Sequence, residues 1–120
     1  MKKSSYNNNC VFCQIAAKQL PAKIVFEDED LIAFYDIKPK ADIHVLIIPK
    51  RHIATLASLE SSDAGLMGKL LYRVRLLAKD LGIAEGFKLV LNNGLKAGQL
   101  VPHLHFHILA GSNYTDISKI

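Results

Sequence analysis

In the segment His103-Leu104-His105-Phe106-His107-Ile108-Leu109, histidine alternates with large apolar residues. Strict alternation over this length is typical of a β-strand, because successive side chains of a strand point to opposite faces of the sheet. We expect the apolar set to face the core. We expect the three imidazoles to share the other face, at intervals of about 6.6 to 6.8 Å.

Other parts of the chain also carry strand patterns. Two β-prone runs flank three acidic residues, which predicts a hairpin, and a branched run that ends at Pro49 predicts a mostly buried strand. In all, five runs are predicted to be strands: residues 23–27, 31–35, 43–48, 87–92 and 104–109.

Two helices are predicted. Apolar residues recur at helical spacing over residues 10–19, where Pro21 ends the pattern. A longer apolar stripe over residues 61–81, followed by Gly82, predicts one amphipathic helix. The fold class is therefore predicted to be α+β: a mainly antiparallel sheet of about five strands, with the long helix packed on one face.

Composition narrows the class of protein. The 120 residues fit one compact domain, and a hydrophobic content of 50% with 22% charged residues is ordinary globular usage. No apolar run approaches the ~20 residues that span a bilayer, and the N-terminus does not read as a signal peptide, so a cytoplasmic location without membrane contact is expected. The net charge of +4 is scattered, which predicts no specific nucleic-acid binding.

Three of the five histidines of the chain alternate in one strand, which indicates a functional site. Two chemistries fit this pattern. The imidazoles could chelate a catalytic metal ion. Alternatively, one imidazole could attack an electrophile while a second donates a proton.

The loop before this strand helps to decide between them. Gly94 and Gly98 allow positive backbone torsions, so the segment 93–99 can turn its amides toward an anion. A phosphate held there would lie against the imidazoles, which favours phosphorus chemistry. The alternative is that the glycines only shape a hairpin-like connection.

The only cysteines, Cys10 and Cys13, form a C-x-x-C pair. A reducing compartment argues against a structural disulfide. Metal binding, redox chemistry and chance remain as explanations.

The histidine strand resembles the motif of the histidine triad (HIT) superfamily, and the rest of the chain is similar to its Hint branch of nucleotide-binding phosphoramidases. The similarity runs from Cys10 to Gly111 and implies a flexible tail at residues 1–9, a HIT domain at 10–111 and a C-terminal tail at 112–120. Supporting segments are Leu20-Pro21-Ala22-Lys23-Ile24-Val25, Phe34-Tyr35-Asp36-Ile37, His44-Val45-Leu46-Ile47-Ile48-Pro49-Lys50, Asn92-Asn93-Gly94 and Gly98-Gln99.

The resemblance implies a catalytic role for three histidines. His105 would attack the α-phosphorus of an AMP-type substrate and carry the nucleotidyl group, His107 would bind the phosphoryl oxygens, and His44 would tune their protonation. A neutral imidazole attacks well when an acceptor, commonly a backbone carbonyl, holds its other nitrogen. No cofactor would be required for catalysis.

The resemblance also implies a nucleotide pocket. Asp36 would accept the ribose hydroxyls, because a carboxylate is an acceptor with two oxygens. Apolar residues would grip the purine, and the glycine loop would hold the sugar-phosphate. The base residues are Val11, Phe12, Phe34 and Ile37; the phosphate-side residues are Asn92, Gly98, Gln99 and the amide of Val101.

Some relatives complete the cysteine pair with two histidines, which here are His52 and His103. Two thiolates and two imidazoles form a closed tetrahedral set, so the implied zinc ion is structural. The alternative is a metal-free pair of buried thiols.

The implied function is a hydrolase of nucleoside phosphoramidates, acyl-adenylates or related adenylated compounds, acting as a homodimer. The chain has Leu100 where many Hint relatives have Ser or Thr, so it has no hydroxyl there to protonate a leaving group. A purine-nucleotide sensor with little catalysis, a metalloenzyme, a dinucleoside polyphosphate hydrolase and a nucleotidyl transferase are the alternatives.

Overall fold

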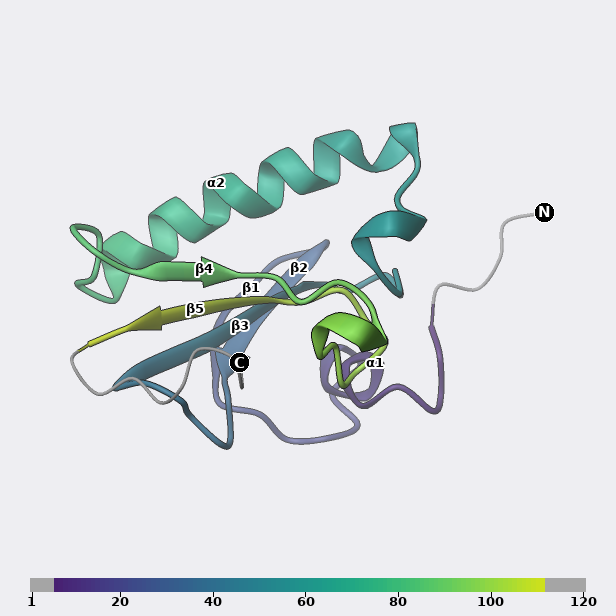
Figure 1. Ribbon diagram of the computed structural model, residues 1–120. Coiled ribbons are helices and arrows are strands. Elements are labelled where there is room, and N and C mark those ends of the chain that lie inside the picture. The colour runs from purple at the N-terminus through teal and green to yellow at the C-terminus, as the bar shows by residue number, and fades with distance from the viewer. Residues whose placement is uncertain (1–5, 112–120) are drawn as a thin grey trace.

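The computed structural model describes residues 6–111. It confirms the α+β class: five strands form one sheet in the order β1-β2-β3-β5-β4, and each neighbouring pair is antiparallel (Figure 1). The strands are β1 Ile24–Glu27, β2 Leu31–Tyr35, β3 Ile43–Pro49, β4 Lys88–Val90 and β5 Phe106–Ala110.

The helices are one short and one long, as expected. They are α1 Val11–Ala16 and α2 Ala64–Asp80, and three 3-10 turns lie at η1 Leu56–Ser58, η2 Ser61–Asp63 and η3 Leu95–Ala97. Gly82 adopts φ +74° and its N–H donates to the Lys79 carbonyl at 3.1 Å, which ends α2 in a left-handed turn as predicted.

The long helix covers one face of the sheet (Figure 1). The α2 residues Leu70, Val74 and Leu77 are buried in one cluster with Val45 of β3 and Ile108 of β5. Burial of this stripe supplies most of the drive for α2 to form, because isolated helices of this length are marginal in water.

The opposite face carries α1 and the histidines. Phe12 and Ile15 of α1 pack in one buried cluster with Phe34 and Leu46 of the sheet. Because side chains alternate along β3, His44 shares this face with Leu46. The two faces are therefore divided between a core under α2 and a site beside α1.

The histidine strand differs from its prediction. Regular pairing in β5 starts at Phe106, not at residue 104. Pro102 cannot donate to a ladder, and the N–H of His103 donates to the Val101 carbonyl at 2.8 Å, so the chain bends just before the strand. The N–H of Leu104 then donates to the Ile53 carbonyl at 2.6 Å. His103 is thus directed apart from the other two histidines of the motif.

The first helix also ends earlier than its pattern indicated. Lys18 adopts φ +63°, and the N–H of Gln19 donates to the Gln14 carbonyl at 2.8 Å. This left-handed turn ends α1 at Ala16, before Pro21 is reached.

The expected tails lie mostly outside the described residues, which exclude 1–5 and 112–120. Residues 6–9 form a turn against the domain, in which the N–H of Cys10 donates to the Asn7 carbonyl at 3.0 Å. Within residues 6–111, neither helix has the length and apolar character needed to cross a bilayer.

Candidate functional site

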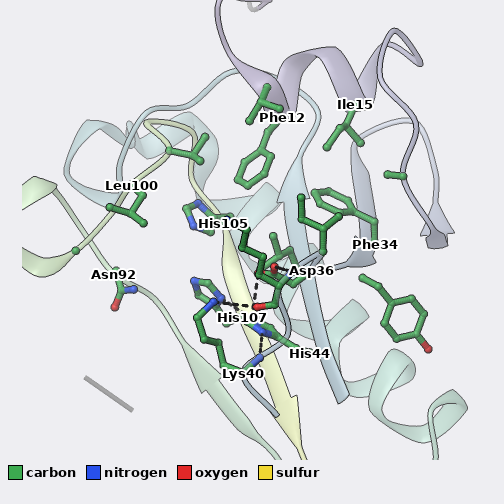
Figure 2. A pocket seen from close by; sticks show the side chains of 18 of the residues that line it. Phe12, Ile15, Phe34, Asp36, Lys40, His44, Asn92, Leu100, His105 and His107 are labelled. Carbon is green, nitrogen blue, oxygen red and sulfur yellow. Dashed lines mark hydrogen bonds and ion pairs between the residues drawn. The ribbon is translucent and has the colours of Figure 1, made fainter. Parts of the chain in front are cut away.

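A pocket of about 340 Å³ lies between α1, the β2–β3 connection, the segment 92–101 and β5 (Figure 2). Ten of the eleven predicted nucleotide-site residues line it, together with His44. The ten are Val11, Phe12, Phe34, Asp36, Ile37, Asn92, Gly98, Val101, His105 and His107.

One end of the pocket is apolar. Phe12 and Phe34 meet edge to face with ring centroids 5.6 Å apart, and both are buried. Val11 is 38% exposed and Ile37 is 91% exposed, so these two residues form the rim and not the core. An apolar wall with aromatic faces suits a flat heterocycle.

His105 presents a lone pair to the pocket. Its Nδ1 lies 2.7 Å from the backbone carbonyl of His103, and a carbonyl can only accept, so Nδ1 carries the proton. Nε2 is then the unprotonated nitrogen, which is the nucleophilic atom of a neutral imidazole. The edge-on ring of Phe12, at 5.0 Å between centroids, packs against His105.

His107, in contrast, presents an N–H group. The backbone N–H of Lys40 donates to His44 Nδ1 at 3.0 Å, so His44 is protonated on Nε2. That Nε2–H donates to His107 Nδ1 at 2.9 Å, which leaves His107 with its proton on Nε2. The rings of His105 and His107, 5.1 Å apart, thus offer a lone pair and an N–H side by side.

Burial keeps these rings neutral. Desolvation lowers the pKa of His107 to about 4, and the neighbouring His105 and His44 add to this effect. Desolvation also lowers the pKa of His105 and of His44, against the opposing charge of Asp36. At neutral pH the site therefore contains imidazoles and not imidazolium ions.

Asp36 supplies a carboxylate at the pocket wall. Its Oδ1 accepts from the backbone N–H of Lys38 at 2.8 Å, and its Oδ2 lies 3.5 Å from His44 Nε2. The first contact fixes the carboxylate in a turn. The second places it next to the histidine pair.

Gln99 differs from its prediction. Its side chain is 3% exposed and holds the glycine loop together: Oε1 accepts from the Gly94 N–H at 2.7 Å, and Nε2 donates to the carbonyls of Ala54 at 2.7 Å and Val101 at 3.1 Å. These contacts use its amide within the protein, so its side chain shapes the loop and does not line the pocket.

The cysteine pair meets two histidines in a second cluster. Cys10, Cys13, His52 and His103 place their ligand atoms within 4.8 Å of one another. The Sγ of Cys10 and of Cys13 lie 3.3 and 3.5 Å from His103 Nδ1. The Nδ1 of His52 lies 3.2 Å from Cys13 Sγ. Sulfur and nitrogen ligands of one tetrahedral zinc ion lie about 3.5 Å apart.

Hydrogen bonds around this cluster suit a metal. His103 donates from Nε2 to the Pro49 carbonyl at 2.8 Å, which leaves the Nδ1 lone pair directed at the two sulfurs. Burial raises the pKa of the Cys13 thiol to about 11, so a cation is needed beside it for the thiolate to form at neutral pH. The cluster can therefore hold a metal ion such as zinc.

A second possible ligand group, formed by Asp36, His44 and His107, suits a metal poorly. Its atoms also lie within 4.8 Å. However, His44 Nε2 carries a proton because its Nδ1 accepts from the Lys40 N–H. A metal would need the lone pair at that nitrogen. This hydrogen bond therefore disfavours the hypothesis that the histidines of this strand chelate a catalytic metal ion.

Four further pocket residues lie in irregular segments or have the pattern of core residues, so the sequence did not indicate them. Lys38 and Lys40 line the pocket from the β2–β3 connection, and Ile15 and Leu46 line its apolar end. Lys40 precedes His44 by four residues, and this spacing alone does not predict a contact. The bond from its backbone N–H to the histidine ring depends on the turn between them.

The HIT domain model matches residues 17–114. Protein HitA of Neisseria gonorrhoeae is 45% identical over 102 residues, which are 85% of this chain and 95% of the relative. The protein named adenylylsulfatase HINT1 of Arabidopsis thaliana is 40% identical and aligns with 84% of this chain and 70% of its own.

A solved structure supports the same assignment. The crystal structure of a HIT family hydrolase from Legionella pneumophila Philadelphia 1 superposes with a TM-score of 0.86 at 44% identity. The match covers 92% of this chain and 99% of that one. Sequence, fold and the histidine pair agree, and the chain belongs to the HIT domain family.

Proposed function

We propose that this chain is a purine nucleotide-binding hydrolase that cleaves a bond to the α-phosphorus of AMP-type substrates through a nucleotidyl-His105 intermediate. Nucleoside phosphoramidates and acyl-adenylates are the proposed substrate classes. The observation that carries the proposal is the pair of opposite tautomers: His105 offers a lone pair where His107 offers an N–H. A nucleophile beside a hydrogen-bond donor is what phosphoryl attack requires.

The names of relatives support this chemistry. The Arabidopsis relative is named an adenylylsulfatase, and a related structure from Candida albicans is described as a histidine triad nucleotide-binding protein. Adenylyl sulfate is itself an AMP group joined to an anionic leaving group. We therefore add it to the proposed substrates.

In the first step, the purine lies against the apolar wall that Phe12 and Phe34 form, and the ribose hydroxyls donate to Asp36. The Nε2 lone pair of His105 forms a bond to phosphorus, and the bond to the leaving group breaks with its electron pair. An amine leaving group also takes up a proton from solvent as it departs, whereas a sulfate or carboxylate departs as the anion. The Nδ1–H bond to the His103 carbonyl stabilises the positive charge that spreads over the ring. His107 donates to a phosphoryl oxygen.

In the second step, water attacks phosphorus from the side that the leaving group vacated. The nitrogen–phosphorus bond breaks and returns its electron pair to His105 Nε2. AMP and a proton are released. A neutral imidazole leaves readily, so this step regenerates the starting tautomer.

The Cys10, Cys13, His52 and His103 cluster is proposed to bind structural zinc. With four protein ligands the ion would have no open position for substrate, so it would supply stability and no reaction step. The cluster ties α1 to the segment before β5, because Cys13 lies in α1 and His103 precedes the strand.

One observation favours a second function, a nucleotide sensor with little catalysis. Leu100 lines the pocket and is 87% exposed, so an apolar side chain stands at the opening near the histidines. It has no proton to give to a departing amine. Tight AMP binding without turnover of any adenylated compound would support this alternative.

The test is a panel of AMP phosphoramidate, an aminoacyl-adenylate, adenylyl sulfate and a diadenosine polyphosphate. Mass spectrometry after rapid quench should find a nucleotidyl group on His105. His105→Ala should lose turnover of every substrate and still bind AMP. Turnover that persists at the wild-type rate in this variant would disprove the mechanism.

We also propose a homodimer that pairs α2 and the β4 edge of the sheet. Leu71 and Tyr72 of α2 are 50% and 61% exposed, and Leu89 of β4 is 39% exposed. Apolar side chains on an edge strand and its neighbouring helix need cover. Light scattering should give twice the chain mass of 13.3 kDa, and Leu71→Glu should reduce the measured mass to that of a single chain.

A further inference from the structure

The pocket binds phosphate, in the proposed function, with histidines that carry no charge. Both rings are buried, and their hydrogen bonds to the His103 carbonyl and to His44 suit neutral imidazoles. Burial is the main cause that lowers the pKa of His107 to about 4, and Asp36 adds a negative charge of its own. An anionic substrate therefore needs a cation from elsewhere. Among the described residues that line the pocket, the Lys and Arg residues are Lys38 and Lys40.

Two hydrogen bonds hold Lys40 in the turn beside His44. Its backbone N–H donates to His44 Nδ1 at 3.0 Å, and its side chain turns back so that Nζ donates to the Lys38 carbonyl at 2.9 Å. Figure 2 shows this side chain reaching beside His107. After burial and the neighbouring histidines, the positive charge of Lys40 is a further cause that lowers the pKa of His107.

Lys38 differs in position although it is only two residues away. Its side chain is exposed, whereas that of Lys40 is half-buried. A charge that is partly removed from solvent interacts more strongly with an anion than an exposed one does. Lys40 is therefore the cation that an anion in this pocket would meet.

The chemistry of the leaving group determines how much such a cation can assist the reaction. An amine leaves from phosphorus only after it gains a proton, whereas a sulfate or carboxylate leaves with the bonding electron pair as a stable anion and needs no proton. Leu100, 87% exposed at the opening of the pocket, has no proton to give. The pocket thus combines a cation, Lys40, with an apolar residue, Leu100. This combination suits a leaving group that departs as an anion, such as sulfate or a carboxylate.

On the basis of the function proposed above, we propose that Lys40 is a specificity-determining residue that selects AMP-type substrates whose leaving group is an anion. Its ammonium pairs with the negative charge on the group that departs as the nitrogen–phosphorus bond to His105 forms. Adenylyl sulfate and acyl-adenylates are favoured over phosphoramidates of neutral amines.

The test compares two substrates that share AMP and differ in the leaving group: adenylyl sulfate and adenosine 5′-phosphoramidate. Lys40→Met should lower kcat/KM for adenylyl sulfate by about 10- to 100-fold, since a charge-assisted contact is lost, and lower that for the phosphoramidate by less than about threefold. Lys40→Arg should retain most of the wild-type ratio of kcat/KM for adenylyl sulfate to kcat/KM for the phosphoramidate. Lys79→Met, which removes an exposed charge in the last turn of α2, is the matched control and should leave both values unchanged.

Equal losses on both substrates, or no loss on adenylyl sulfate, would overturn the assignment of Lys40 while the His105 mechanism stands. Absence of turnover by the wild type would overturn the proposed function instead. In that case the dissociation constants of the same two compounds replace kcat/KM. Lys40→Met should then weaken the binding of adenylyl sulfate selectively. An unchanged ratio of the two dissociation constants would overturn the Lys40 assignment as well.

Discussion

His103 and His105 are two residues apart in one motif, yet they serve different parts of the molecule. His103 donates from Nε2 to the Pro49 carbonyl, so its Nδ1 lone pair faces Cys10 and Cys13. His105 donates from Nδ1 to the His103 carbonyl, so its Nε2 lone pair faces the pocket. In each case a backbone carbonyl selects the tautomer.

Charge does not separate these two histidines. Both rings are buried, with exposed fractions of 0% and 7%, and desolvation lowers the pKa of both. What differs is the nitrogen that the backbone leaves unprotonated and the direction in which it points. The comparison teaches that the hydrogen bond behind an imidazole indicates its chemistry better than its place in a motif does.

The largest effects are expected when each of these two histidines is replaced by asparagine. His105→Asn should lower kcat/KM by at least about 1,000-fold, because the nucleophile is lost, and should keep the wild-type metal content. His103→Asn should lose the metal and lower the melting temperature. Elemental analysis with kinetics checks both. Similar phenotypes for the two variants would refute the division of roles.

Removal of the metal should have the next largest effect. Chelation of the wild type, or Cys10→Ser with Cys13→Ser, should lower the free energy of unfolding by several kcal/mol, because an ion bound only by the folded state stabilises it. Added zinc should restore the chelated wild type and not the double variant. Identical melting curves with and without chelator would show that the cluster is a metal-free thiol pair.

Acid should destabilise the folded protein through the buried ring of His107. The pKa of His107 is about 4 when folded, against an ordinary value of 6.5, so below pH 6.5 the unfolded chain takes up a proton that the folded chain does not. The free energy of unfolding should fall between pH 6.5 and 4, by up to about 3 kcal/mol from this residue.

His107→Asn should make that part of the pH profile shallower when zinc is held constant, because one of several buried histidines is removed. Urea unfolding at several pH values gives the measurement. A slope that is the same in the variant and the wild type would mean that His107 titrates normally.

The smallest effect is expected at His44, which touches the reaction only through His107. His44→Ala removes the donor to His107 Nδ1, so His107 no longer keeps its proton on Nε2 alone, and kcat/KM should fall about tenfold. His44→Gln, whose amide can donate, should recover part of the loss. If glutamine is no better than alanine, the hydrogen bond does not set the tautomer.

Much of the fold could be predicted because its signals are local. The stripe that ends at Leu81 with Gly82 behind it defines α2 to within a few residues. The alternation around His107 correctly placed Phe106 and Ile108 on the face under α2. Periodicity encodes these features directly.

The rest depends on contacts between distant segments. The strand starts at Phe106 because residues 101–104 bond to one another and to Ile53, and no pattern in the motif reports that. Gln99 was assigned to the ligand, yet its amide is used by Gly94, Ala54 and Val101. The role of Lys40 depends on a turn that brings its N–H to a ring.

Phe12 stands between the two cysteines in the sequence and between the two sites in space. Its ring lies 6.0 Å from that of His103 and 5.0 Å from that of His105. It belongs to a six-residue helix, too short to persist alone, so α1 is ordered by what it contacts on either side. In the proposed function, metal and nucleotide would therefore share the cost of ordering one helix. By thermodynamic reciprocity, each would then raise the affinity of the other by the same factor.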